Sequence, residues 1–218
     1  MRTVLVFLFC AISYFANGQT YKMYATQNLH NQLRLNTATG EVKQIQDDGQ
    51  SWTIGEAVEE YGSKDGRYCL AKTQNMWTFL MLDTYSGKTW QVQFSVKGSD
   101  YMFRVPLQGY SLAYPDTESI WTNRFQLFAT KNMWTFILLD SYRGRLWQGQ
   151  YSSSDLDNLM CIPINETDLV SNVEKCTFTI QPLTSMYQYY LINESNGDMW
   201  KFQWSTKGGD YRWINKVN

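Results

Sequence analysis

A repeat within the chain constrains its fold more than any other feature. Residues 75–79, with the sequence NMWTF, return unchanged as residues 132–136, and each copy continues into a similar strand, turn and tryptophan. Such a repeat indicates one supersecondary unit that packs on copies of itself. The copies can also be compared. Positions kept in every copy are candidates for structural roles, and positions that break the pattern are candidates for function.

Four copies align on turn glycines that lie roughly 50 residues apart. The aligned glycines are Gly40, Gly87, Gly144 and Gly197. The turn opens with Asp83 and Asp140 in the two middle copies and with asparagine in the outer two. Asp or Asn at the start of a turn, with Gly at the position that needs a positive φ, is typical of a β-hairpin. Each glycine is therefore predicted to close a hairpin between the second and third strands of its unit.

The strand pattern predicts an all-β fold. An alternating strand opens each unit, two strands flank the turn, and a fourth is expected near 103–107, 160–164 and 211–214 in copies two to four. Four short antiparallel strands per unit are typical of a propeller blade, so we expect a four-bladed β-propeller. A β-sandwich or barrel of duplicated hairpins and an open β-solenoid are the alternatives. The expected units cover about 19–62, 63–118, 119–172 and 173–218.

One short motif resembles a known repeat family. Asp83, Ser86 and Gly87, followed by Trp90, resemble the aspartate–turn–glycine–tryptophan motif of PQQ-type propeller repeats. The tryptophan lies three residues after the glycine, whereas the family usually has it at four. The resemblance covers one short motif per unit, so it implies the propeller architecture and not a quinone cofactor.

The N-terminus reads as an export signal. Met1 and Arg2 are followed by an apolar stretch too short to span a bilayer and then by small residues up to Gly18, which predicts cleavage near that residue. A mature chain that begins at Gln19 resembles exported proteins of Bacteroidetes-type bacteria. We therefore expect a secreted or periplasmic protein. No later segment is long and apolar enough to be a transmembrane helix.

Charge and cysteine content narrow the partners and the covalent chemistry. Lys and Arg number 19 against 20 Asp and Glu, without a basic run, so a nucleic-acid partner is not expected. Three cysteines follow the predicted signal, and an odd count permits one disulfide or none. Cys161 and Cys176 are the closer pair in sequence, and Cys69 is the third.

The pairing of the two central strands predicts which side chains share a sheet face. If Leu82 faces Thr89, the large apolar residues of the second copy fall on one face, which is the predicted core. The tryptophans expected to be buried there are Trp77, Trp90, Trp134 and Trp147. On the opposite face a glutamine recurs in every copy, and we expect its amide to bond backbone groups between neighbouring units. These glutamines are Gln46, Gln93, Gln150 and Gln203.

The first copy breaks this pattern. His30, Gln32 and Arg34 stand where the other copies have aromatic or aliphatic residues, and Lys43 and Asp47 replace aromatic residues across the hairpin. Charged groups cannot be buried there unless they are paired. The face is therefore either a polar cap at an open edge of the array or a polar site where the ring meets itself. In the second case His30, Gln32, Arg34 and Lys43 are the candidate ligand-binding residues, and Arg and Lys could hold a carboxylate or an acidic sugar.

The chemistry of an enzyme is not apparent in the sequence. His30 is the only histidine, no common catalytic or phosphate-binding motif occurs, and we expect no metal site and no cofactor. These features favour a non-enzymatic binding module for a glycan or another polar ligand. A protein-interaction scaffold of the envelope is the alternative, and a glycosidase is the least favoured. Exposed clustering of Trp52, Trp121 and Trp213 would favour ligand binding.

Overall fold

The computed structural model of the chain describes residues 20–58, 64–113, 123–153, 156–170 and 177–217. These residues form an all-β fold of sixteen strands in four antiparallel sheets, which confirms the predicted fold class. No helix among them is long and apolar enough to cross a membrane. The predicted signal peptide, Trp121 and Cys176 lie outside the described residues. The expectations for the signal peptide and for Trp121 stay predictions, whereas Cys161 is a free thiol and does not form the disulfide with Cys176 that their spacing favoured.

Each sheet contains four strands that follow one another in sequence and pair in that order. The first sheet contains β1 (Tyr21–Ala25), β2 (Asn31–Asn36), β3 (Val42–Gln46) and β4 (Ser51–Gly55). The second contains β5 (Tyr68–Lys72), β6 (Thr78–Asp83), β7 (Thr89–Gln93) and β8 (Phe103–Gln108). The third contains β9 (Phe125–Ala129), β10 (Thr135–Asp140), β11 (Arg145–Gln150) and β12 (Met160–Asn165). The fourth contains β13 (Phe178–Pro182), β14 (Gln188–Asn193), β15 (Met199–Gln203) and β16 (Trp213–Lys216).

The predicted glycine turns are present in all four sheets. The four aligned glycines have φ between 70° and 79°, the left-handed region in which side chains with a Cβ are strained. In the second sheet the N–H of Gly87 donates to the carbonyl of Asp83 at 2.9 Å, and the Asp83 carboxylate accepts from the N–H of Tyr85. The turn residues therefore close the hairpin as the sequence predicted.

The strand register confirms the predicted division of side chains between two faces. Leu82 pairs with Thr89, and Met81 pairs with Trp90. We call the face that packs on the preceding sheet the leading face; in the second sheet it carries Phe79, Met81 and Val92. The opposite, trailing face packs on the next sheet.

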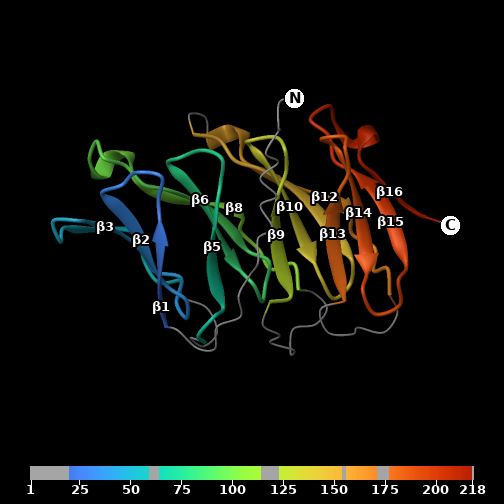
Figure 1. Ribbon diagram of the computed structural model, residues 1–218, viewed down its shortest axis with the longest axis horizontal. Helices are drawn as coiled ribbons and strands as arrows, with labels where there is room; N and C mark the ends of the chain where they lie inside the picture. Colours follow the sequence, from blue (N-terminus) through green and yellow to red (C-terminus); the bar gives the residue numbers. More distant parts are fainter. Residues whose placement is uncertain (1–19, 59–63, 114–122, 154–155, 171–176, 218) are drawn as a thin grey trace, which may run out of the picture.

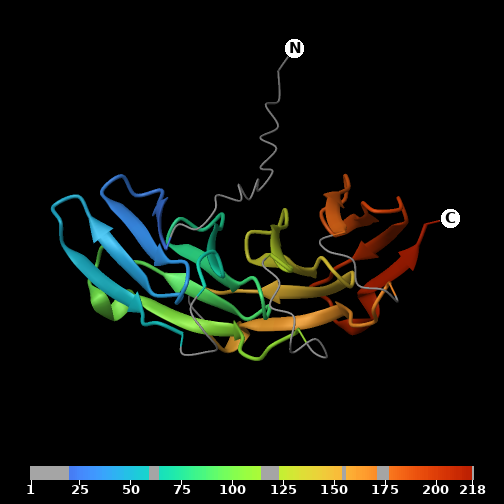
Figure 2. The ribbon, with the colours of Figure 1, turned by 90° about the horizontal axis from the view of Figure 1, so that it is seen from below.

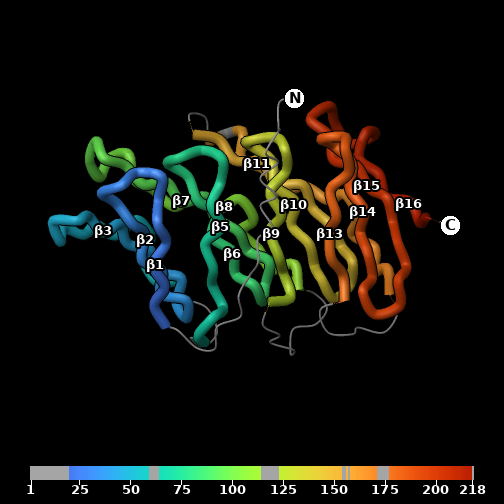
Figure 3. Tube along the Cα trace, viewed as in Figure 1, coloured from blue at the N-terminus to red at the C-terminus, as the bar shows by residue number. Residues whose placement is uncertain are grey.

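The four sheets stack in chain order and form an open array (Figures 1 and 2). Three core clusters fill the three spaces between successive sheets. The fourth strands of neighbouring sheets lie beside one another, β4 next to β8, β8 next to β12 and β12 next to β16. The trace in Figure 3 places the first and last sheets at opposite ends, so the sheets resemble propeller blades without closing into a ring.

Candidate functional site

The same aromatic contact forms each of the three joints between successive sheets. The first residue of the following sheet lays its ring over the turn glycine of the sheet before it. The ring–glycine pairs are Tyr68 on Gly40, Phe125 on Gly87 and Phe178 on Gly144, where an added Cβ would lie 3.2, 2.8 and 3.0 Å from the ring. The backbone N–H of each aromatic residue also donates to a carbonyl of that turn, at 2.8, 2.9 and 3.0 Å. Glycine is needed at these turns for close approach as well as for its φ.

A buried glutamine makes a second contact at every joint. The amide of Gln44 donates to the carbonyl of Ser95 at 2.9 Å and accepts from the N–H of Ser95 at 3.2 Å. Gln91 forms the same pair of bonds with Ser152, and Gln148 forms it with Ser205. We call this contact the glutamine clasp. It satisfies buried polar groups on both sides of each joint, which is the usual condition for burying an amide.

These glutamines are not the ones that the sequence predicted to bridge the units. Gln93, Gln150 and Gln203 each donate to a carbonyl eight residues further on, in the short 3-10 helix that precedes the fourth strand of the same unit. The expectation for this set was therefore wrong, because the residues two positions earlier reach the neighbouring sheet. Both sets lie on the trailing face, so the face alone does not distinguish their roles.

Buried ion pairs anchor the turns of the two middle sheets. The Asp83 carboxylate accepts from the guanidinium of Arg67 at 2.7 and 3.1 Å, and Asp140 accepts from Arg124 at 2.8 and 3.1 Å. Asp140 also accepts from Arg145 at 2.7 Å. These carboxylates are fully buried and occupied by donors. We therefore assign them to stabilising the turns rather than to acid–base chemistry.

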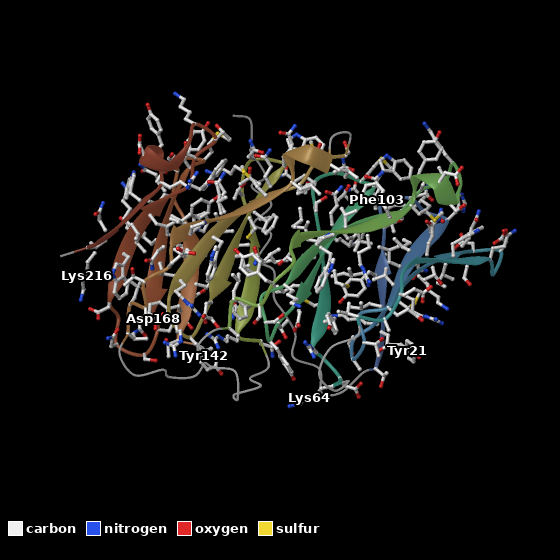
Figure 4. The ribbon with its side chains drawn as sticks, turned by 180° about the vertical axis from the view of Figure 1, so that it is seen from behind. Tyr21, Lys64, Phe103, Tyr142, Asp168 and Lys216 are labelled. Carbon is white, nitrogen blue, oxygen red and sulfur yellow. The ribbon has the colours of Figure 1, made fainter. Side chains whose placement is uncertain are left out.

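The predicted ligand-binding residues lie on the leading face of the first sheet, which is the outward face at one end of the array. The side chains there pair among themselves. His30 Nδ1 lies 3.1 Å from Asp47 Oδ2, and Glu41 lies 3.5 Å from Arg34 and 3.7 Å from Lys43. In Figure 4, Tyr21 labels this end and Lys216 labels the other.

This placement bears on the two interpretations of the polar face. Within one chain the first and last sheets lie far apart, so they do not enclose a site between them. Gln32 is exposed, and His30 and Asp47 are more than half exposed. The face therefore lies at an open end of the array, as the polar-cap interpretation expects. The role of these residues in ligand binding stays a prediction.

One polar contact on this face, between His30 and Asp47, replaces a ring pair found in the other sheets. Trp77 and Phe94 have ring centroids 5.3 Å apart, and Trp134 with Tyr151 and Tyr187 with Trp204 form the equivalent pairs at 5.4 and 4.9 Å. His30 and Asp47 hold these positions in the first sheet. The exchange makes the outward face more polar than the three covered leading faces.

The other end of the array is the trailing face of the fourth sheet. Its central strands present half-buried Tyr190, Ile192, Met199 and Lys201. Gly197 has the same φ as the other turn glycines, and nothing lies within 4 Å of an added Cβ there. Lys201 occupies the position of the clasp glutamines, as its pairing with Tyr190 shows.

The tryptophans do not form an exposed platform among the described residues. Trp90 and Trp147 are buried as predicted, while Trp77 and Trp134 are only half-buried. Trp52 and Trp213 are half-buried and belong to the first and fourth sheets. They therefore do not cluster, and the described tryptophans give no support to a sugar-stacking surface.

The described residues offer little space for a small ligand between the sheets. A hollow of about 10 Å³ beside Gln27, Lys72 and Phe79 has room for about one water molecule. No group of three or more His, Cys, Asp or Glu side chains in the described ranges is placed to hold a metal ion. The two end faces are therefore the most informative surfaces of the molecule.

We predict that two thiols are slow to react in the folded protein. Burial raises the pKa of Cys69 to about 11 and that of Cys161 to about 12, and neither sulfur takes part in a disulfide. At about pH 8 both therefore remain protonated, and the thiolate is the reactive form. Alkylation followed by peptide mass spectrometry should label these two only after denaturation. Rapid labelling of the native protein at either position would contradict the prediction.

Comparisons with known proteins give no family assignment. No family model matches the chain, and no curated protein does. Solved structures do match. One from Bacteroides uniformis, named a "putative 6-phosphogluconolactonase", has a TM-score of 0.51 at 9% identity, over 91% of this chain and 54% of that one. A protein of the same name from Bacteroides fragilis has a TM-score of 0.47 at 8% identity, over 91% of this chain and 58% of that one.

The chain thus spans about half the length of the solved structures that it resembles. At such low identity the likeness shows the fold alone. It also corrects one expectation. The absence of catalytic motifs in the sequence led us to expect a non-enzymatic binding module. The same arrangement of sheets occurs in a protein named for a hydrolase activity, so this fold does not support that inference.

Proposed function

We propose that the chain is a ring-forming propeller subunit. Two copies join head to tail, with the fourth sheet of each covering the first sheet of the other, and the eight sheets close a ring. The trailing face of the fourth sheet and the leading face of the first are the two uncovered faces of the array. They correspond in strand position to the faces that meet at every internal joint.

The observation that carries this proposal is the aromatic contact at the joints. Tyr21 holds the position of Tyr68, Phe125 and Phe178 as the first residue of its sheet, yet this residue is 55% exposed. Gly197 holds the position of the covered glycines, yet no ring lies over it. One end of the array therefore carries the ring and the other carries the glycine. The φ of Gly197 requires glycine with or without a covering ring, so the exposed ring of Tyr21 is the feature that a solvent cap would not need.

The composition of the two end faces is compatible with reversible association. Met23 is exposed and Ile45 half-buried on the first sheet, and Tyr190, Ile192 and Met199 are half-buried on the fourth. The charges of the first sheet already have partners on the same face, which lowers the cost of covering them. Such mixed faces resemble non-obligate interfaces rather than a protein core. The joint between copies should thus be weaker than the internal joints.

A head-to-tail contact also restricts the assemblies that can form. Heterologous interfaces give a closed ring when the rotation closes and an open filament when it does not. A chain that matches about half of a longer solved structure is compatible with half of a ring. We therefore expect a particle of twice the chain mass.

The test is sedimentation equilibrium at chain concentrations between about 1 and about 100 µM. The weaker interfaces of ordinary size have dissociation constants in the micromolar range. Replacing Tyr21 with alanine should weaken each joint about 30-fold, because aromatic anchors contribute about 2 kcal/mol or more, and the dimer, which has two such joints, about 1,000-fold. Tyr101→Ala is the matched control, since Tyr101 is 56% exposed and belongs to the second unit, in the short helix η1 (Ser99–Tyr101), and not to either end sheet. A wild-type particle of one chain mass at all concentrations would refute the proposal.

A further inference from the structure

We infer that a charge pair, Lys201 of one copy with Asp47 and Asp48 of the other, replaces the glutamine clasp at the joint between copies and sets its partner and direction. This inference rests on the proposed head-to-tail ring. It identifies the site on each end face that recognises the other, and it names the partner as a second copy of the same chain.

The first observation is that both partners of the glutamine clasp are replaced by charged residues, one at each end of the array. Every internal joint pairs a glutamine on the trailing face with a serine that follows an aromatic residue on the next sheet. The glutamine position holds lysine in the fourth sheet, and the aromatic–serine position holds Asp47 and Asp48 in the first. Among the described residues, these two sheets are the ones with a face that no other sheet covers. A cation and two carboxylates therefore stand where the two ends would meet.

The second observation is that Asp48 keeps the turn made by the serines. The side-chain oxygens of Ser95 and Ser205 accept from the N–H two residues later, at 2.9 Å in both turns. Asp48 accepts from the N–H of Gln50 at 3.0 Å in the same way. The backbone of Asp48 is thus held in the position that the clasp requires, and the carboxylate adds a charge.

The chemistry of the exchange is complementary. An amide both donates and accepts, so a clasp glutamine bonds the carbonyl and the N–H of its serine. An ammonium group has three donors and no acceptor, so Lys201 can replace only the donating half of the clasp. Nearby carboxylates supply the remaining attraction as charge-assisted bonds. Asp47 and Asp48 provide them, with Asp47 more than half exposed beside His30.

The exchange also explains how the ends select each other. Contact between two fourth sheets would bring Lys201 against a second Lys201, and contact between two first sheets would bring the carboxylates of Asp47 and Asp48 together. Like charges brought together at an interface disfavour the wrong partner. The pair therefore specifies the first sheet of another copy as the partner of the fourth.

The test uses charge reversal in two chains. One variant carries Lys201→Glu, and the other carries both Asp47→Lys and Asp48→Lys. Each variant on its own should dimerise at least about 100-fold more weakly at low salt, because like charges then meet at the joints. An equal mixture of the two variants should restore dimers, since both joints then pair opposite charges. The measurement is sedimentation equilibrium, with native mass spectrometry to identify the mixed dimer. Melting temperatures of the separate variants check that each remains folded.

A conservative variant separates this inference from the ring itself. Between low and high salt, we expect the wild-type dimer to weaken roughly tenfold, because salt screens the charge pair. Lys201→Gln restores the residue of the internal clasps, so this variant should still dimerise, and its dimer should not weaken with salt. If both charge-reversed variants dimerise like the wild type, the charge pair is refuted and the ring stands. If the wild type is monomeric throughout, the proposed function fails and the charge pair fails with it.

Discussion

Replacing Asp140 with alanine is expected to lower the free energy of unfolding by about 3–5 kcal/mol. The carboxylate is fully buried and holds Arg124 and Arg145, together with the N–H of Tyr142. Without it, the buried guanidinium of Arg124 loses its opposite charge, and that of Arg145 is left with the carboxylate of Asp168 at 3.5 Å. The loss of a partner in this setting is far more costly than the net contribution of the pair, since buried charges then remain uncompensated.

The repeat offers a matched control for this substitution. Asn193 holds the equivalent position in the fourth sheet and accepts from the N–H of Ser195 at 3.0 Å. Asn193→Ala removes a neutral hydrogen bond and should cost only about 1 kcal/mol. Urea unfolding of both variants measures the difference. Equal losses would show that the turn, and not the buried charge, determines the effect.

The second large effect is expected for Trp90→Ala, which should cost about 3–5 kcal/mol through the cavity that it leaves. The ring is 9% exposed and belongs to the core between the first two sheets, with the ring of Tyr68 at 6.3 Å. The guanidinium of Arg104 lies 6.0 Å from its centroid and would lose that contact.

A typical domain has a margin of about 5–15 kcal/mol, so this loss should be visible as a much lower melting temperature. Tyr110→Ala is the control, because Tyr110 is 68% exposed and such surface changes fall within about 0.5 kcal/mol. Melting curves that coincide for Trp90→Ala and the wild type would mean that this ring does not belong to the core.

Much of the fold could be predicted because the repeat allows the chain to be compared with itself. The turn glycines fixed the hairpins, and the pairing of Leu82 with Thr89 then assigned every central side chain to a face. Four strands were expected in every unit, but the position of the fourth strand in the first unit, β4, was not predicted from its residues. Neighbouring strands, and not its own sequence, hold it in the sheet.

The contacts between sheets could not be predicted in the same detail. Gln91 and Gln93 share the trailing face, and the sequence does not show which of them reaches the next sheet. That depends on how closely two sheets approach, which the large core side chains determine. The rotation from one sheet to the next also arises from packing, so the count of four repeats did not reveal that the array stays open.

The candidate site was predicted in part. The polar residues of the first copy were recognised as exceptional, because they break a pattern kept in the other three. Tyr21 and Gly197 were not recognised, because they keep the pattern. Their importance appears only when the structure shows that the ring and the glycine of each joint come from different sheets and that these two have no neighbour.

The most direct test of the head-to-tail joint is a photo-crosslink from position 21. Tyr21 is replaced with the benzophenone analogue of phenylalanine, which keeps an aromatic ring at that position, and the irradiated dimer is digested for mass spectrometry. The joint predicts a crosslink between chains from position 21 to the turn at residues 193–197, which contains Gly197. Crosslinks that join the first sheets of two copies, or that stay within one chain, would contradict it.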